Sequence, residues 1–330
     1  MLLPSVVAHA DWGCDPRKRQ VAVARLAGGR YQVVSLSRAP GGSHGQTDLF
    51  DELAAGSRAG AALVGFDFTI GLPRAYAAAV GVDSFPRFLG QIGAGPWRHF
   101  DQVAASPEEI SLHRPFYPRR PGGTRREHLY AGLGLSASAL RRRADGSDAE
   151  TLFWTLGRKQ AGKASLNGWR LLRDARARGT GMALWPFDGS LPALLAGPAE
   201  FVVAEAYPRQ FYRQIGAPPR QRWSKRRRGD RLECVPALLA WAQALGASFA
   251  APIARRVGAG LADGPAGEDE FDAVVGVLGM IAVVTGAIPA GAPDDDPAVL
   301  ATEGWILGRP ADPQTTPNRR SPASPRPGTM

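Results

Sequence analysis

The chain has 330 residues, of which 44% are hydrophobic, so it can bury the core of one large domain or of one domain with an insertion. No run approaches the roughly 20 apolar residues that a membrane-spanning helix needs. The apolar N-terminus lacks the basic segment of a signal peptide and is broken by Pro4. Two cysteines give neither a disulfide framework nor a zinc site. We therefore expect a cytoplasmic protein with no membrane partner.

The net charge of +10 and the isoelectric point near 10.3 point to a polyanionic partner, with nucleic acid as the first candidate. A general enrichment of Ala, Gly, Pro and Arg would produce the same charge without any such partner. Charge alone therefore does not decide between the two.

The N-terminal third predicts four strands and a helix. Two segments alternate between apolar and polar residues, as half-buried strands do, and the pair Gly28-Gly29 supplies the turn between them. With the strand before them they form an antiparallel meander, at residues 5–12, 19–26 and 31–38. A helix at 47–57 and a nearly continuous apolar strand at 61–68 follow.

The middle of the chain, about 72–198, is irregular and rich in Pro, Trp and Arg, so we expect an insertion into the sheet domain, helical at 151–178. The core pattern then resumes with a strand, two helices and a strand or strand-like cap, at residues 201–208, 225–246, 267–286 and 302–308. One domain thus covers 1–308, and the Pro/Ser/Thr-rich tail 309–330 is expected to be disordered.

Carboxylates stand where apolar strands end. Asp11 closes VVAHAD, Asp67 closes ALVGFD, and Glu205 lies in FVVAEAYP. A buried carboxylate is costly unless a cation or hydrogen bonds compensate it, and ligands of open α/β sheets gather at the carboxyl ends of strands. Asp272, expected in the first turn of its helix, shares a face with Gly276 and Gly279, which would let the helix approach the sheet.

Each carboxylate also has a purely structural interpretation. Asp11 and Asp67 could form turns, Glu205 could pair with an arginine, and Asp272 could stabilise a helix N-terminus. These structural interpretations are plausible for each residue alone. They are less plausible for all four carboxylates together, in this order of strands and helices.

That order resembles the ribonuclease H-like fold, an α/β fold in which three antiparallel strands are followed by parallel strands, flanked by helices. More closely, the chain resembles a family of predicted ribonuclease H-like nucleases, domain of unknown function 429. The matching motifs are "ADWG", "VGFDFTIGLP", "VVAEAYPR", "KRRRGDRL", "EFDAVVGVLG" and "EGWILG", and the insertion segments "RPFYPRRPGG", "LGRKQAGKASLNGW" and "LWPFDG". The resemblance covers 5–308 and implies that Asp11, Asp67, Glu205 and Asp272 form the acidic site.

A nuclease of this kind hydrolyses phosphodiester bonds with two ions, Mg²⁺ or Mn²⁺. Asp11 would bridge both ions, Asp67 and Glu205 would each hold one, and Asp272 would complete a shell or orient water. Basic residues should then contact the phosphates of DNA or RNA. The candidates are Lys159, Lys163, Lys225, Arg226, Arg227, Arg228 and Arg231, although a solvated run of charges is the alternative.

Two other functions remain open. A nucleotide-dependent phosphotransferase of the actin/hexokinase type would use Asp11-Trp12-Gly13 as its first phosphate motif, but no second full domain of that fold is evident. A non-catalytic nucleic-acid-binding protein would bind in a salt-dependent way without turnover.

Overall fold

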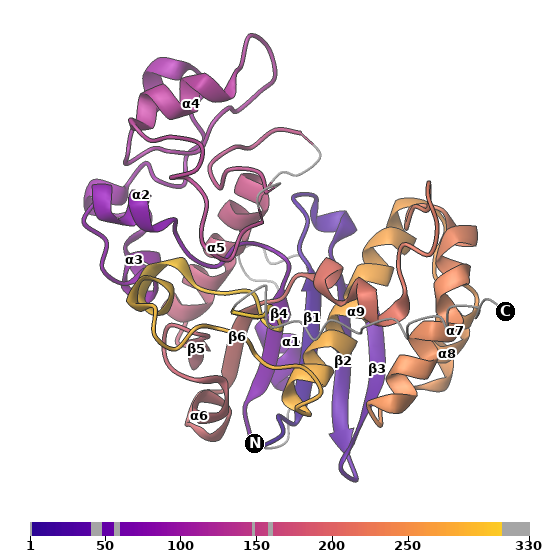
Figure 1. The fold of residues 1–330 in the computed structure, drawn as a ribbon. Helices are drawn as coiled ribbons and strands as arrows, with labels where there is room; N and C mark the ends of the chain where they lie inside the picture. Colours follow the sequence, from indigo (N-terminus) through magenta and orange to yellow (C-terminus); the bar gives the residue numbers. More distant parts are fainter. Residues whose placement is uncertain (1, 41–47, 56–59, 147–148, 158–160, 312–330) are drawn as a thin grey trace, which may run out of the picture.

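A seven-stranded mixed sheet forms the centre of the molecule (Figure 1). The structure is a computed structural model, and it describes residues 2–40, 48–55, 60–146, 149–157 and 161–311. Most of the predicted tail, and Lys159, lie outside the described residues. The strand order is β5-β6-β4-β1-β2-β3-β7.

The first three strands form the predicted antiparallel meander. They are β1 (Val6–Asp11), β2 (Gln20–Ala27) and β3 (Arg30–Arg38). Gly28 and Gly29 connect β2 to β3 with φ values of 57° and 77°. A two-residue hairpin turn with positive φ at both positions matches the twist of the strands, which explains the glycine pair.

Parallel strands extend the sheet on the other side of β1. β4 (Ala62–Phe66) pairs with β1, and β6 (Phe201–Glu205) pairs with β4. Every residue of these three strands is buried, as expected for strands covered on both faces. Two short parallel edge strands, β5 (Met182–Leu184) and β7 (Ser248–Phe249), were not predicted, because so few residues carry no pattern.

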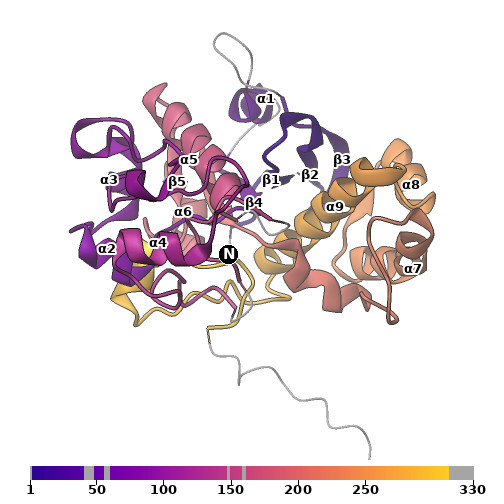
Figure 2. The ribbon, with the colours of Figure 1, turned by 90° about the horizontal axis from the view of Figure 1, so that it is seen from above.

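Helices cover both faces of the sheet, and α1 and α9 lie on opposite sides of β1–β3 (Figure 2). The helices before β6 are α1 (Leu49–Ala55), α2 (Arg74–Ala79), α3 (Phe85–Gln91), α4 (Arg126–Leu133), α5 (Ala161–Ala177) and α6 (Leu191–Ala196). Those after it are α7 (Arg228–Ala244), α8 (Ala251–Gly258) and α9 (Gly264–Val284). Short turns of helix complete the chain: η1 (Pro16–Lys18), η2 (Gly95–Trp97), η3 (Pro107–Glu109), η4 (Pro208–Ile215) and η5 (Val299–Glu303).

The long segment between β4 and β6 departs from the prediction in two places. Its main helix, α5, begins at Ala161 rather than near 151, because Leu152 and Phe153 form a turn and Trp154 bridges to Tyr117. Its end returns to the sheet as β5. The predicted element at 302–308 is a strand-like cap, since Ile306 makes a parallel bridge to Glu205.

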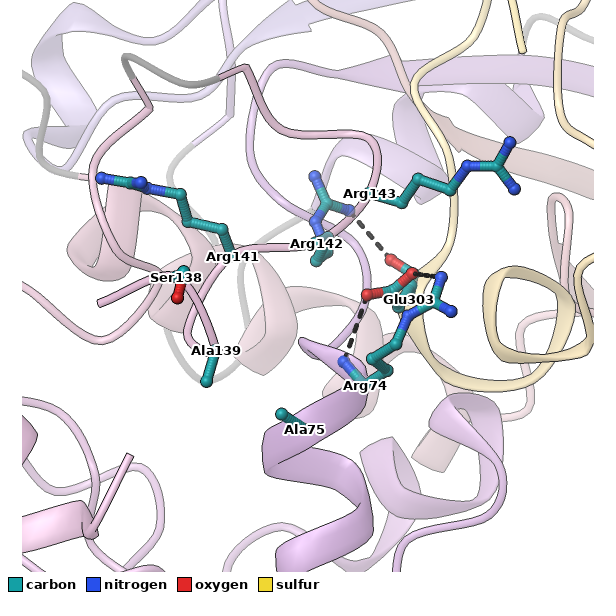
Figure 3. A pocket seen from close by; sticks show the side chains of 8 residues that line it. All are labelled: Arg74, Ala75, Ser138, Ala139, Arg141, Arg142, Arg143 and Glu303. Atoms are coloured by element: carbon teal, nitrogen blue, oxygen red, sulfur yellow. Dashed lines mark hydrogen bonds and ion pairs between the residues drawn. The ribbon is translucent and has the colours of Figure 1, made fainter. Parts of the chain in front are cut away.

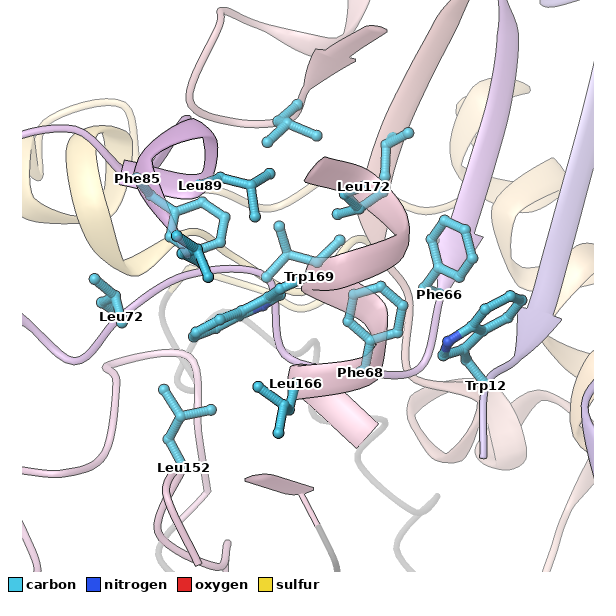
Figure 4. Packing of buried hydrophobic residues seen from close by; sticks show 14 of the residues in the cluster. Trp12, Phe66, Phe68, Leu72, Phe85, Leu89, Leu152, Leu166, Trp169 and Leu172 are labelled. Atoms are coloured by element: carbon cyan, nitrogen blue, oxygen red, sulfur yellow. The ribbon is translucent and has the colours of Figure 1, made fainter. Parts of the chain in front are cut away.

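The sheet divides the hydrophobic core into two layers. On one face Trp12 and Phe66 pack edge-to-face with ring centroids 5.5 Å apart, and the aromatic rings of the insertion continue this layer (Figure 4). Trp169 of α5 lies in its middle and donates its indole N–H to the carbonyl of Thr69 at 2.7 Å. The layer ties the insertion to the end of β4.

The second layer lies under α9, which is buried along most of its length. Gly276 faces β1, where a Cβ atom would overlap the ring of His9. Gly279 faces η4, where a Cβ atom would overlap the ring of Phe211. The predicted close approach of this face to the sheet is confirmed at Gly276, whereas Gly279 lies against η4. No helix in the described ranges is long and apolar enough to cross a membrane, and neither Cys14 nor Cys234 forms a disulfide bond.

Gly276→Ala is expected to lower the free energy of unfolding by about 1–3 kcal/mol, because its methyl group would displace either His9 or the helix. Gly90→Ala on α3 is the control, since a Cβ atom there meets open space and alanine favours helix. Urea denaturation of both variants measures the difference. Equal stability of the two variants would contradict the close approach of α9 to β1.

Candidate functional site

Asp11 and Asp67 lie at the carboxyl ends of neighbouring parallel strands. Asp11 is the last residue of β1, and Asp67 directly follows β4. Side chains alternate along a strand, and His9 and Gly65, two residues earlier, both contact α9. Asp11 and Asp67 therefore face the α9 side of the sheet. The backbone N–H of Trp12 donates to Oδ1 of Asp67 at 2.6 Å and joins the two strand ends.

Asp272 completes this group from α9. The helix begins at Gly264, so Asp272 lies in its third turn and not in the first, and a helix N-terminus does not explain it. Its carboxylate accepts a hydrogen bond from the hydroxyl of Tyr212 on η4 and forms an ion pair with the ammonium of Lys225. The structure thus brings Asp11, Asp67 and Asp272 near enough for their charges to interact, whereas the sequence predicted that Glu205 would join them.

Burial raises the pKa of all three aspartates, and neighbouring carboxylates raise it further. Burial raises the pKa of Asp11 well above its ordinary value, and the charges of Asp67 and Asp272 raise it further. Burial raises the pKa of Asp67 to about 6, although the hydrogen bond from Trp12 opposes this. Burial also raises the pKa of Asp272, and Lys225 and Tyr212 offset part of the effect. Such an accumulation of buried negative charge is typical of a functional site rather than of a structural one.

Asp269 is a fourth carboxylate, which the sequence pattern did not predict as part of the site. It precedes Asp272 by three residues and therefore shares its side of α9. Burial, Glu268 and Asp272 raise its pKa to about 7, and its Oδ2 atom is buried without a hydrogen-bond partner among the described residues. The spacing of three could have identified it, but the acidic run GEDE made it look like a helix N-terminus.

Asp269 gives the cation-free protein a predictable dependence on pH. Its folded-state pKa of about 7 exceeds the unfolded value of 3.8, so its contribution to stability is complete below pH 4 and is lost as the pH rises through 7. In EDTA, the free energy of unfolding of the wild type is expected to fall by roughly 1–2 kcal/mol relative to that of Asp269→Asn between pH 5 and pH 8, a value reduced to allow for solvent screening. Denaturation at both pH values measures it, and a pH-independent difference would contradict it.

Glu205 does not join the aspartates, which corrects its predicted role. It lies opposite Phe66 in the register of β6 and β4, on the other face of the sheet from Asp67. There the buried guanidinium of Arg142 donates to both of its oxygens at 2.7 and 2.8 Å, and the N–H of Ile70 donates at 2.8 Å. The structural interpretation of Glu205, an ion pair with an arginine, is the one observed.

Arg142 joins three parts of the chain at this edge. Besides Glu205 it pairs with Asp145 at 2.8 Å and donates to the carbonyls of Ile70 and Glu303. A pocket of about 540 Å³ opens beside it, between the insertion and the C-terminal segment (Figure 3). Three of its arginines have acidic partners, for example Arg74 with Glu303 and Asp296, and Arg141 donates to the carbonyl of Ala149.

The predicted phosphate contacts divide into several groups. Lys225 reaches Asp272, and Arg226 pairs with Glu268 at 3.0 Å. Arg227 pairs with Asp230, Arg228 donates to the carbonyl of Ala259, and Arg231 is fully buried with three backbone carbonyls as acceptors. Arg231 therefore has a structural role, which corrects its assignment to the substrate.

Lys163 is the predicted contact best placed for an approaching anion. It is exposed on the first turn of α5. Burial raises the pKa of the Cys14 thiol, three residues beyond Asp11, and the charge of Lys163 opposes this shift. Arg19 lies nearby, with its guanidinium 4.1 Å from the centre of the Trp12 ring. Positive charge thus borders the β1 end of the site.

The aspartates suit a hard divalent cation by donor type. Carboxylate oxygens are the ligands that Mg²⁺ and Mn²⁺ prefer, and a cation would relieve the repulsion that raises the pKa of Asp11. In the part of the chain that the structure describes, no group of three His, Cys, Asp or Glu side chains is already spaced to hold a metal ion. The donor types of Asp11, Asp67 and Asp272 suit a cation, but these side chains do not form a ready cation site in this structure, and Lys225 lies on one of the Asp272 oxygens.

Comparisons of the chain with protein-family models, with curated proteins and with solved structures find no match. The arrangement of Asp11, Asp67 and Asp272 is thus the basis for any functional conclusion.

Proposed function

We propose that this chain is a divalent-cation-dependent nuclease with a ribonuclease H-like core, as its resemblance to that nuclease family implies. The observation that carries the proposal is the convergence of Asp11, Asp67 and Asp272 from β1, β4 and α9. Three antiparallel strands followed by parallel ones, with β1 at the junction, support the fold assignment.

Each aspartate is held by the chain in a way that suits cation binding. The N–H of Trp12 orients Asp67, and the hydroxyl of Tyr212 orients Asp272. Asp11 is buried at the end of β1, where burial limits competing water. Mg²⁺ or Mn²⁺ held by these residues would activate a water molecule and stabilise charge on the phosphate. The expectation of two ions stays part of the proposal, with Asp269 as the candidate donor in place of Glu205.

A nucleic acid is the substrate that the surrounding charge favours. The chain carries a net charge of +10, while the site itself is acidic. An acidic site with basic borders holds a cation and a phosphodiester together, and Lys163 and Arg19 supply such a border near β1. DNA and RNA are equally compatible with these contacts.

Cleavage of a panel of labelled nucleic acids tests the proposal. The full chain is incubated with about 5 mM Mn²⁺, an excess suited to a weak carboxylate site. The substrates are single- and double-stranded DNA and RNA, a hybrid duplex and a branched junction. We expect cleavage of at least one of these, abolished by EDTA and by Asp67→Asn. Absence of cleavage for all of them, or cleavage that survives in Asp67→Asn, would refute the nuclease function.

A further inference from the structure

Lys225 occupies an unusual position for a residue in a basic run. Its ammonium contacts Asp272 and lies 3.4 Å from Glu268. It also attracts the carboxylate of Asp11 electrostatically. Burial alone would lower the pKa of this ammonium, but Asp272 and Glu268 raise it overall. The group is therefore charged, and it neutralises part of the acidic site.

The backbone of Lys225 is fixed while its side chain spans the gap to α9. Its carbonyl accepts a hydrogen bond of 2.6 Å from the buried guanidinium of Arg231. The preceding residues are held as well, since Trp223 donates to the carbonyl of Asp230 and the N–H of Ser224 donates to the Asp230 carboxylate. Movement of the ammonium thus requires only new side-chain torsions.

The side chain also reaches solvent. Its exposed fraction is 30%, against 10% for the side chain of Asp272. Lys225 therefore lies between the carboxylates and the medium, where an incoming polyanion would meet it. The ammonium of Lys225 contacts Asp272 and Glu268, while Oδ2 of Asp269 is buried without a hydrogen-bond partner among the described residues.

From these contacts we infer that Lys225 is a displaceable counter-ion: its ammonium holds Asp272 in the cation-free protein, and when a divalent cation binds, it moves to a phosphate of the nucleic-acid strand. The inference rests on the proposed function, because it assumes that Asp272 takes part in cation binding. It reconciles the predicted phosphate contact of Lys225 with its observed contact to a carboxylate. Lysine suits this role because it is a compact charge on a flexible stem.

Amine labelling of the wild-type chain tests the displacement without any substitution. The chain has only four lysines, at positions 18, 159, 163 and 225, so mass spectrometry resolves each rate of acetylation. In EDTA, Lys225 should react at least about tenfold more slowly than exposed Lys18. Saturating Mn²⁺ should accelerate Lys225 severalfold and leave Lys18 unchanged.

Calorimetric titration of Mn²⁺ into substrate-free protein supplies the second readout. Lys225→Met should bind Mn²⁺ about tenfold more tightly than wild type, because a competing charge is gone, yet cleave nucleic acid about tenfold to a hundredfold more slowly. Lys18→Met is the control, since Lys18 is exposed and its charge lowers the pKa of Asp269 and Asp15 without an ion pair to Asp269 among the described residues. Its Mn²⁺ affinity should stay within about twofold of wild type.

The results separate this inference from the nuclease proposal. If wild type binds Mn²⁺ but Lys225 stays unreactive, or if Lys225→Met binds Mn²⁺ no more tightly than wild type, the counter-ion role is wrong and the nuclease proposal stands. If wild type neither binds Mn²⁺ nor cleaves any nucleic acid, the nuclease proposal itself fails. Circular dichroism establishes that each variant is folded.

Discussion

Arg142→Met is expected to lower the free energy of unfolding by about 3–5 kcal/mol, because it leaves the buried carboxylate of Glu205 without its counter-charge. Arg142 also donates to two backbone carbonyls, which would lose a donor in the same step. Chemical denaturation of the purified variant measures the loss.

Arg143→Met is the matched control for this prediction. Arg143 has 44% of its side chain exposed and pairs with Asp296 at the surface, so its loss should cost less than about 1 kcal/mol. The double variant Arg142→Met/Glu205→Gln should recover part of the stability, because the unpaired charge is removed. Similar costs for Arg142→Met and Arg143→Met would show that Glu205 is not held by Arg142.

Asp11→Asn is expected to have opposite effects on stability and on cleavage. The cation-free variant should be more stable than wild type by about 1–2 kcal/mol at pH 8, because a buried, mutually repelling charge is removed. Its cleavage rate should fall by about a thousandfold or more, because the amide cannot supply the charge that cation binding requires. Thermal denaturation in EDTA and the nucleic-acid assay in Mn²⁺ measure the two effects.

Asp83→Asn provides the comparison, since 78% of that side chain is exposed and its pair with Arg87 lies at the surface. We expect its stability to change by less than about 0.5 kcal/mol and its cleavage rate to stay unchanged. A destabilised Asp11→Asn with full activity would mean that Asp11 is an ordinary structural residue.

The sequence was sufficient for the strands that carry the site, because their patterns are strong. Alternation in β2 and β3 and the glycine pair between them predicted the hairpin. Apolar runs that end in a carboxylate predicted the positions of Asp11 and Asp67, and helical spacing predicted the approach of Asp272 to the sheet.

Glu205 could not be placed from the sequence, for a physical reason. β6 is buried on both faces, so its apolar residues do not reveal which face each side chain occupies. Only the register with β4 puts Glu205 opposite Phe66 rather than beside Asp67. Its partner Arg142 comes from the irregular insertion, whose path no periodic pattern could predict.

The position of the Lys225 side chain could not be predicted from the sequence either. A basic run predicts an exposed surface, and the sequence contains no sign that one of its members turns inward to α9. That contact depends on the packing of Arg231 beneath the loop, which is a tertiary feature.

Diffraction at the manganese absorption edge, from crystals soaked in Mn²⁺, tests the central claim most directly. We expect anomalous density between the carboxylates of Asp11, Asp67 and Asp272, with the Lys225 ammonium displaced from Asp272 and the pair of Arg142 with Glu205 intact. Density at Glu205 instead, or no density near the three aspartates at saturating Mn²⁺, would contradict it.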